Sequence, residues 1–174
     1  MFYQSEPARE DRYRDVLNNP AICPAIISSM WYPPLYDQTQ DKDKYVVLQF
    51  HSSAYALGGC RPMEGGWGPE VLAKHMSGLD FYPQYQFASH PNSRFPAALQ
   101  DAVSSFNYRL KLGIPAFRIT FSGDSAGGNL ALALLQYAKA QRMLPYLRYS
   151  LFWSRWLDLA ASRETIVIWG VILG

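Results

Sequence analysis

The stretch Arg118–Leu130, RITFSGDSAGGNL, constrains the fold more than any other part of the chain. A β-rich segment leads into Gly-Asp-Ser-Ala-Gly, and an Ala- and Leu-rich run leaves it, which predicts a strand, a sharp turn and a buried helix. Such a turn strains the backbone of Ser125, and a strand and helix can approach closely only where Gly123 and Gly127 present no Cβ. Ser125 is then expected at a strand's C-terminal end and a helix N-terminus, where developing negative charge is favoured.

The rest of the chain places this turn in a parallel α/β sheet. The predicted strands are 44–50, 84–88, 117–122 and 149–153, and the predicted helices are 96–112 and 129–142. Strands that alternate with helices predict a mostly parallel central sheet flanked by helices. We expect residues 1–44 to be a polar segment of turns and loops, residues 45–160 to be the α/β core, and residues 161–174 to be an apolar tail.

Composition and charge exclude several classes of protein. The chain is 49% hydrophobic and 17% charged, which is typical of a single globular domain. Its net charge is only +2 and the basic residues are dispersed, so we expect no nucleic-acid partner. The two cysteines lack any CxxC spacing, so we expect free thiols and no metal site.

Two further absences concern targeting. The N-terminus lacks the apolar core of roughly 7 to 15 residues that a secretory signal needs, so we expect a cytoplasmic protein. The apolar run 165–174 is shorter than the roughly 20 residues needed to cross a bilayer, so we expect no membrane span.

Three motifs together resemble a known family. HSSAYALGG at 51–59, SRFPAALQDAV at 93–103 and GDSAGGNLALAL at 123–134 are similar to the hormone-sensitive-lipase-like branch of the α/β-hydrolases. This branch includes bacterial and fungal carboxylesterases and arylacetamide deacetylases, and the resemblance covers residues 45–158. It implies an α/β-hydrolase fold, a small-molecule ester as substrate, and neither metal nor cofactor. It also implies that Ser125 forms an acyl-enzyme and that the backbone N–H of Ala126 donates to the oxyanion.

The loop that should complete the oxyanion hole departs from the family pattern. The family has His-Gly-Gly followed by Gly or Ala, where this chain has His51-Ser52-Ser53-Ala54. The resemblance implies that the N–H groups of Ser52 and Ser53 donate to the oxyanion. The lost glycines present these groups from conformations that a Cβ penalises, by about 1 to 2 kcal/mol where φ is positive.

The triad acid and histidine cannot be assigned in this sequence. The fold has the order Ser, acid, His, but the three histidines (His51, His75 and His90) all precede Ser125. Asp158 matches a structural aspartate of the family's SPWLDL segment and not the acid. His51 has two interpretations, as a substitute base beside Ser125 or as the residue that shapes the oxyanion loop. We expect His75 on a helix surface and His90 in loop contacts.

The sequence therefore predicts an incomplete α/β-hydrolase fold with its last strands missing, inactive by itself. An unprotected sheet edge near Trp153 then predicts self-association. Two alternatives remain open. The chain is either a non-catalytic small-molecule binding module, like the plant hormone receptors of this branch that lack the catalytic histidine, or one whose missing base comes from a partner subunit.

Overall fold

The computed structural model describes residues 2–41, 43–52, 54–65, 67–143 and 150–154. The strands are β1 (Tyr3–Ser5), β2 (Ile27–Tyr32), β3 (Tyr45–Phe50), β4 (Gly78–Pro83), β5 (Ile119–Asp124) and β6 (Ser150–Trp153). The helices are α1 (Gln38–Asp41), α2 (Trp67–Leu72), α3 (Ala97–Lys111) and α4 (Ala126–Ala140), and α2 continues into a π-helical turn, η4 (Ala73–Ser77).

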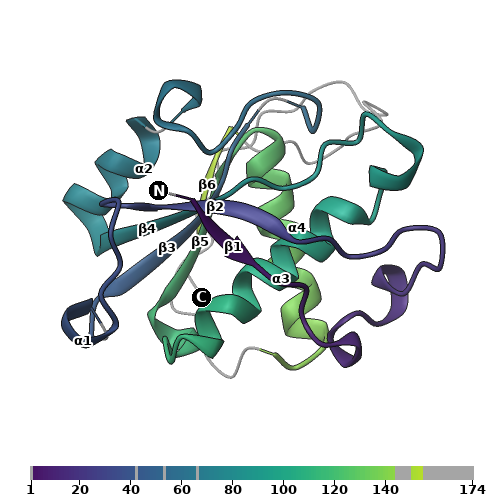
Figure 1. Cartoon of the computed structure of the whole chain (residues 1–174), viewed down its shortest axis with the longest axis horizontal. Helices are drawn as coiled ribbons and strands as arrows, with labels where there is room; N and C mark the ends of the chain where they lie inside the picture. Colours follow the sequence, from purple (N-terminus) through teal and green to yellow (C-terminus); the bar gives the residue numbers. More distant parts are fainter. Residues whose placement is uncertain (1, 42, 53, 66, 144–149, 155–174) are drawn as a thin grey trace.

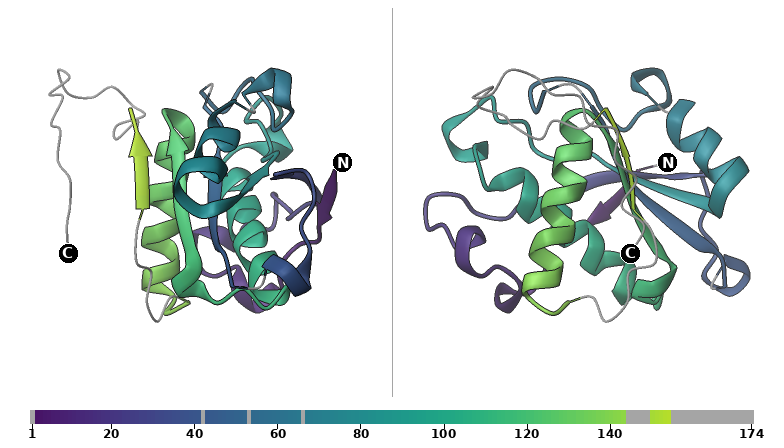
Figure 2. Two further views of the ribbon diagram at one scale, coloured as in Figure 1. Left: turned by 90° about the vertical axis from the view of Figure 1, so that its left-hand side faces the viewer. Right: turned by 180° about the vertical axis from the view of Figure 1, so that it is seen from behind.

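The strands form one mixed sheet in the order β1-β2-β4-β3-β5-β6. Neighbours from β4 to β6 run parallel, whereas β1 and β2 run antiparallel at the other end. Figure 2 shows β1 and β6 on opposite sides of the molecule. Because β3 and β5 pair in the centre, the segments that follow their carboxyl ends meet at one edge of the sheet.

The main core lies between the sheet and helices α3 and α4, while α2 lies on the opposite face (Figure 1). Alternate residues of a strand point to one face, and Val46, Leu48 and Phe50 of β3 are all fully buried in this core. Phe106 of α3 packs edge-on against Phe121 of β5, with ring centroids 5.3 Å apart. Burying each of these side chains contributes about 1.5 to 3 kcal/mol.

The N-terminal segment differs from the expected turns and loops, because it supplies two strands. The β2 sequence ISSMWY lacks the alternation of apolar and polar residues that predicts a strand, because two serines follow one another. Pairing with β4, and not local propensity, therefore defines this strand. Tyr13 shares a hydrogen bond of 2.7 Å with Ser104 of α3, and the Tyr137 hydroxyl of α4 donates to the carbonyl of Arg12 at 2.7 Å. The N-terminal segment is therefore packed onto the two core helices.

The strand predicted at residues 84–88 is wrong, because the strand lies six residues earlier, at Gly78–Pro83. The alternation that suggested a strand at 84–88 comes from Tyr85 and Phe87. Their rings pack around His51 and not against a neighbouring strand. The backbone N–H of Gln86 donates to the carboxyl group of Asp101 on α3 at 2.7 Å, and not to the sheet.

The other predicted elements are confirmed with small shifts. The helix expected at 96–112 is α3, and it ends before Gly113, whose φ is +84°. The strand expected at 117–122 begins two residues later, because 116–118 form a 3₁₀ turn. The apolar tail expected at 161–174 lies outside the described residues.

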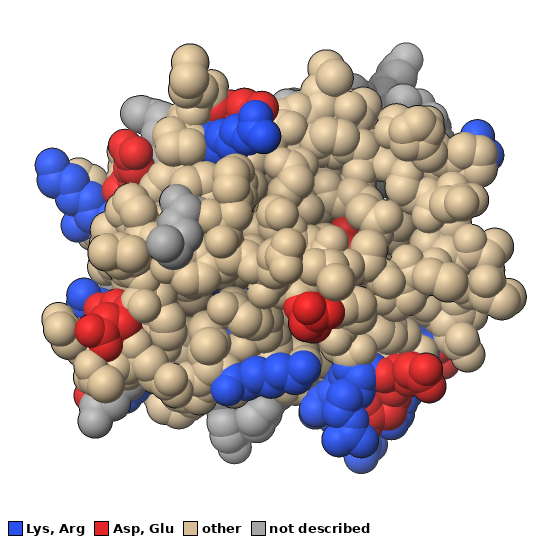
Figure 3. All heavy atoms as spheres, in the orientation of Figure 1, with Lys and Arg blue, Asp and Glu red and all other residues tan. Residues whose placement is uncertain are grey.

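Charge on the surface is sparse and mixed. Figure 3 shows acidic and basic side chains scattered around one face of the molecule, mainly near its rim. Within the described part of the chain, no helix has the length and apolar character to cross a membrane. No cluster of three or more metal-ligating side chains forms among the described residues either.

Candidate active site

Ser125 occupies the single residue between β5 and α4, in a strained conformation. Its φ is +52° and its ψ is −114°, which a side chain normally disfavours. Its N–H donates to the carbonyl of Trp153 in β6 at 2.9 Å, and its carbonyl accepts from the N–H of Asn129 at 3.0 Å. Serine commonly caps a helix, yet the Ser125 hydroxyl makes no capping hydrogen bond to α4. The turn therefore fixes the backbone of Ser125 while its side chain stays off the helix end.

The two glycines around Ser125 lie where a side chain cannot fit. A Cβ at Gly123 would overlap the carbonyl group of Gly127. A Cβ at Gly127 would overlap the carbonyl oxygen of Phe50 at the end of β3, and it would lie 2.5 Å from that of His51. The first turn of α4 thus lies directly against the β3 end, and glycine is required for this contact.

The loop after β3 is also joined to α4 by a side chain. The Tyr55 hydroxyl donates to Oδ1 of Asn129 at 2.7 Å, and burial raises the pKa of Tyr55 above its usual value. Ala54 and Tyr55 have φ values of +58° and +60°. Ser52 does not have a positive φ, and Ser53 lies outside the described residues. The described strain of this loop falls on Ala54 and Tyr55.

His51 is buried and held on both ring nitrogens. Its ring stacks on Tyr85 at a centroid distance of 4.0 Å. Nδ1 lies 2.9 Å from the carbonyl oxygen of Ser52, and Nε2 lies 3.4 Å from Nε2 of Gln84. Burial lowers the pKa of His51, so the neutral ring is favoured. This arrangement favours the loop-shaping interpretation of His51 over its use as a base.

The expected oxyanion donors lie at two neighbouring chain segments. Ala126 is the first residue of α4 and is completely buried. The geometry of an α-helix leaves the N–H of such a residue without a partner inside the helix. Ser52 is half-buried in the loop after β3. This loop begins against Gly127 of α4 and is joined to the same helix by the hydrogen bond of Tyr55. The roles of these groups as oxyanion donors stay predictions.

A base for Ser125 is not found among the described residues. His75 is exposed on η4, and His90 is exposed at the start of a 3₁₀ turn, so both lie in the surroundings expected for them. Within the described part of the chain, no hydrogen bond joins the Ser125 hydroxyl to a histidine or a carboxylate. Asp158 lies outside the described residues.

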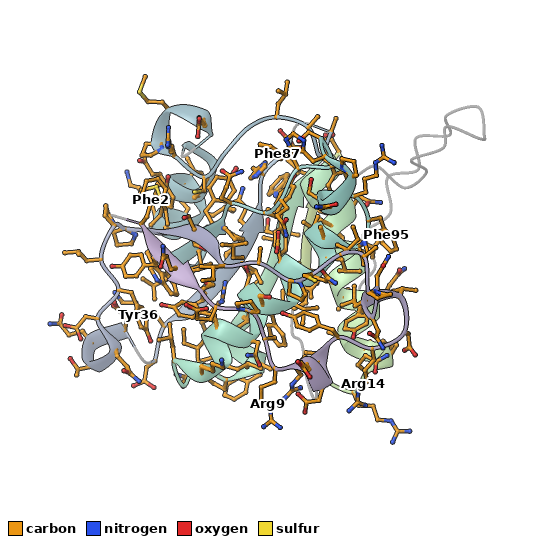
Figure 4. The ribbon with its side chains drawn as sticks, turned by 45° about the vertical axis from the view of Figure 1, so that its right-hand side comes forward. Phe2, Arg9, Arg14, Tyr36, Phe87 and Phe95 are labelled. Carbon is orange, nitrogen blue, oxygen red and sulfur yellow. The ribbon has the colours of Figure 1, made fainter. Side chains whose placement is uncertain are left out.

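A cavity of about 690 Å³ lies beside the loop, at the junction of the N-terminal segment with residues 84–87. Phe2 and Phe87, both labelled in Figure 4, belong to its lining. Cys60 also lines it, and burial raises the pKa of this free thiol to about 11. The volume is within the range of small-molecule sites.

Four residues of this region were missed by sequence reasoning: Tyr55, Gln84, Tyr85 and Asn129. Tyr85 lies under the loop and donates its hydroxyl to the carbonyl of His51 at 2.8 Å. The partners of their side chains lie 24 to 74 positions away in sequence, so no local pattern could have indicated them. Only the aromatic alternation at 84–88 marked part of the group, and it was assigned to a strand.

Comparison with known proteins agrees with this geometry. Residues 47–167 match a family described as having the alpha/beta hydrolase fold. An acetyl-hydrolase of Streptomyces hygroscopicus is 31% identical, over 90% of this chain and 52% of its own length. An ethyl acetate hydrolase of Pseudomonas putida is 33% identical, over 71% of this chain and 39% of its own length. The chain thus spans about half the length of these relatives or less.

Solved structures show the same likeness. The crystal structure of a hormone-sensitive lipase from a metagenome library is 34% identical, with a TM-score of 0.61 over 69% of this chain and 40% of that one. An esterase/lipase from an uncultured bacterium has a TM-score of 0.64 at 25% identity, over 79% of this chain and 44% of that one. The chain therefore belongs to the α/β-hydrolase family, in its hormone-sensitive-lipase-like branch of esterases and acetyl-hydrolases.

Proposed function

We propose that this chain carries the nucleophile and oxyanion part of a serine carboxylesterase. The observation that supports this most is the strained Ser125 at a strand–helix turn closed by Gly123 and Gly127, with its hydroxyl not used as a helix cap. A protein gains no stability from such strain, and it is typical of a residue held for chemistry. The acetyl-hydrolase and ethyl acetate hydrolase relatives support short-chain esters as the substrate class.

In the proposed reaction, Oγ of Ser125 attacks the ester carbonyl and passes its proton to a base. The carbonyl oxygen becomes an oxyanion, which the N–H groups of Ala126 and of the Ser52/Ser53 loop receive. The ester C–O bond then breaks, the alcohol leaves with a proton, and water releases the acid from Ser125. No metal or cofactor takes part in these steps.

We further propose that the 174-residue chain by itself does not turn over esters. The nitrogens of His51 are both engaged, and His75 and His90 are exposed away from hydrogen-bonding contact with Ser125. Without a base, a serine hydroxyl is a weak nucleophile, and only the residual 10³- to 10⁴-fold catalysis over water seen in triad knockouts is expected. A base for Ser125 must then be a group other than these three histidines.

The test compares two proteins with a short-chain p-nitrophenyl ester. The first is the chain itself, where we expect no difference between the wild type and Ser125→Ala. The second joins residues 1–154 to the part of the Streptomyces acetyl-hydrolase that lies C-terminal to the position equivalent to residue 154, so that the relative's own residues can supply an acid and a base. We expect this chimera to hydrolyse the ester and Ser125→Ala to abolish its activity. A folded chimera whose activity survives Ser125→Ala would refute the role of Ser125.

The cavity beside the loop supports a second function, the binding of a small apolar molecule without turnover. In that case, a non-hydrolysable short-chain amide should raise the melting temperature of the wild-type chain. The same rise in Ser125→Ala, together with an inactive chimera, would favour binding over catalysis. Loss of the rise in a variant with Phe87→Arg would place the ligand in this cavity.

A further inference from the structure

The oxyanion loop is held by three hydrogen bonds in sequence. The backbone N–H of Cys60 donates to Oε1 of Gln84 at 3.0 Å. Nε2 of Gln84 faces Nε2 of His51 at 3.4 Å, and Nδ1 of His51 lies 2.9 Å from the carbonyl oxygen of Ser52. The series runs from residue 60 back to residue 52, through a side chain that follows β4.

Each donor in this series is fixed by chemistry. A backbone N–H can only donate, so the Gln84 atom that faces Cys60 must be the oxygen. The NH₂ group of Gln84 therefore faces His51 and donates to its Nε2. In a neutral ring the proton is then on Nδ1, and this is the nitrogen that faces the Ser52 carbonyl, a group that can only accept.

The surroundings of His51 keep this arrangement neutral. Its ring lies flat on Tyr85, and the edges of Tyr82 and Phe87 close two other sides. Burial is the main cause that lowers the pKa of His51, and it outweighs the nearby charge of Glu64, which raises it. An imidazolium would also direct a second N–H at the NH₂ group of Gln84, which is unfavourable.

We propose that Gln84 is a positioning residue of the oxyanion loop, which keeps the proton of His51 on Nδ1 and so holds the carbonyl of Ser52. The role of this loop in binding an oxyanion rests on the function proposed above, whereas the position of the proton on His51 does not. The series offers a physical reason why this loop keeps its place without two glycines. Orientation by a second residue, rather than by backbone freedom, defines the Ser52 peptide.

The proton position is measured directly by nitrogen NMR of the chain labelled with ¹⁵N-histidine. His75→Gln and His90→Gln, both at exposed sites, identify which of the three signals belongs to His51. We expect His51 to show a protonated Nδ1 and an unprotonated Nε2 from pH 6.5 to 8. A proton on Nε2 in the wild type would overturn the proposal without any variant and without any measurement of activity.

Gln84→Glu tests the role of the amide. Its carboxylate still accepts from the Cys60 N–H, but it attracts a proton to Nε2 of His51 and should raise the pKa of His51 by about 1 to 3. Gln136→Glu adds the same charge at an exposed site of α4 and should leave the His51 signals unchanged. Identical His51 spectra in Gln84→Glu and the wild type would refute the proposal.

Gln84→Asn supports the test if the charged variant does not fold. Its shorter amide cannot span from Cys60 to His51, so we expect both proton positions of the ring to be populated. In the active chimera, Gln84→Glu should lower kcat with little change in KM. An inactive chimera with the expected histidine spectra would contradict the proposed function and leave the role of Gln84 intact.

Discussion

The hydroxyl of Tyr55 donates a 2.7 Å hydrogen bond to Oδ1 of Asn129, and so connects the loop after β3 to the first turn of α4. Tyr55→Phe removes the donor and keeps the ring. We expect the free energy of unfolding to fall by about 0.5 to 1.5 kcal/mol, the usual net value of such a bond. Urea denaturation measures this, with Tyr3→Phe as the control, because the Tyr3 hydroxyl donates an exposed hydrogen bond of 3.4 Å to the carbonyl of Pro34. Equal losses in both variants would contradict the importance of this bond.

Ala54 offers a stabilising substitution. It is exposed and has a φ of +58°, so Ala54→Gly relieves about 1 to 2 kcal/mol of backbone strain. Glycine costs about 0.5 to 1 kcal/mol in conformational entropy, so a net gain of up to about 1.5 kcal/mol is expected. Thermal unfolding should show a melting temperature about 2 to 4 °C higher. Ala56→Gly, without positive φ, should lower it, and a rise in both variants would count against strain as the cause.

Gly127 is expected to tolerate no side chain at all. In Gly127→Ala the Cβ meets two backbone carbonyls of the β3 end, which cannot rotate away, so α4 must shift. A loss of about 3 kcal/mol or more is expected, at or above the upper end for overpacking. In Gly68→Ala of α2, the Cβ meets only the amide nitrogen of the Gln49 side chain, at 3.2 Å. Circular dichroism during denaturation should therefore show a large loss for Gly127→Ala and a small effect for Gly68→Ala.

Asp101 makes stability depend on pH. Burial is the main cause that raises the pKa of its carboxyl group from 3.8 to about 7, although Gln86 donates two hydrogen bonds to it. A raised pKa means that the folded state binds the proton more tightly. The contribution of protonated Asp101 to the free energy of unfolding is therefore fully present below pH 4 and is lost as the pH rises to 7. The loss amounts to about 4 kcal/mol at most.

Asp101→Asn removes this titration and keeps an oxygen for the Gln86 N–H. The difference in unfolding free energy between the variant and the wild type should change by several kcal/mol between pH 4 and 7.5. Other carboxyl groups titrate in both proteins and cancel in this difference. A difference that stays constant over this range would show that Asp101 is ionised in the fold.

Self-association remains a prediction. In the described sheet, β6 is the terminal strand, and Trp153 is 50% exposed on it. Edge strands of this kind pair with further chains unless charge opposes it. Gel filtration with light scattering should show mass rising with concentration for the wild type and less so for Trp153→Lys. A monomer at every concentration in the wild type would contradict this prediction.

Local patterns predicted the elements whose own residues define them. The run before Ser125 and the Ala- and Leu-rich run after it led correctly to β5 and α4, and the periodicity at 96–112 led to α3. By contrast, β1 and β2 form through pairing with distant strands, so their sequences carry little signal. Asp80 interrupts the apolar run of β4, which weakens the pattern that would predict this strand. The alternating aromatic residues just after β4 were therefore wrongly predicted to form the strand.

In the candidate site too, the residues that are close in sequence could be predicted and the contacts between distant residues could not. Ser125, Gly123 and Gly127 are close in sequence and serve one turn, so their spacing revealed the geometry. The contacts of Tyr55 with Asn129 and of Gln84 with His51 exist only because β3, β4 and β5 are neighbours in the sheet. A single sequence carries no record of such contacts, and the lost glycines of the loop gave no indication of what replaces them.

The N–H of Ser125 donates to the carbonyl of Trp153, whose neighbour in the β5–β6 register is Asp124. The local backbone at Ser125 therefore depends on the alignment of a strand that begins 25 positions later in the chain. A slip of β6 by one residue would turn this acceptor away, although no residue of the motif had changed. An insertion between α4 and β6 that shifts this strand would therefore disturb the backbone of Ser125 from outside the motif.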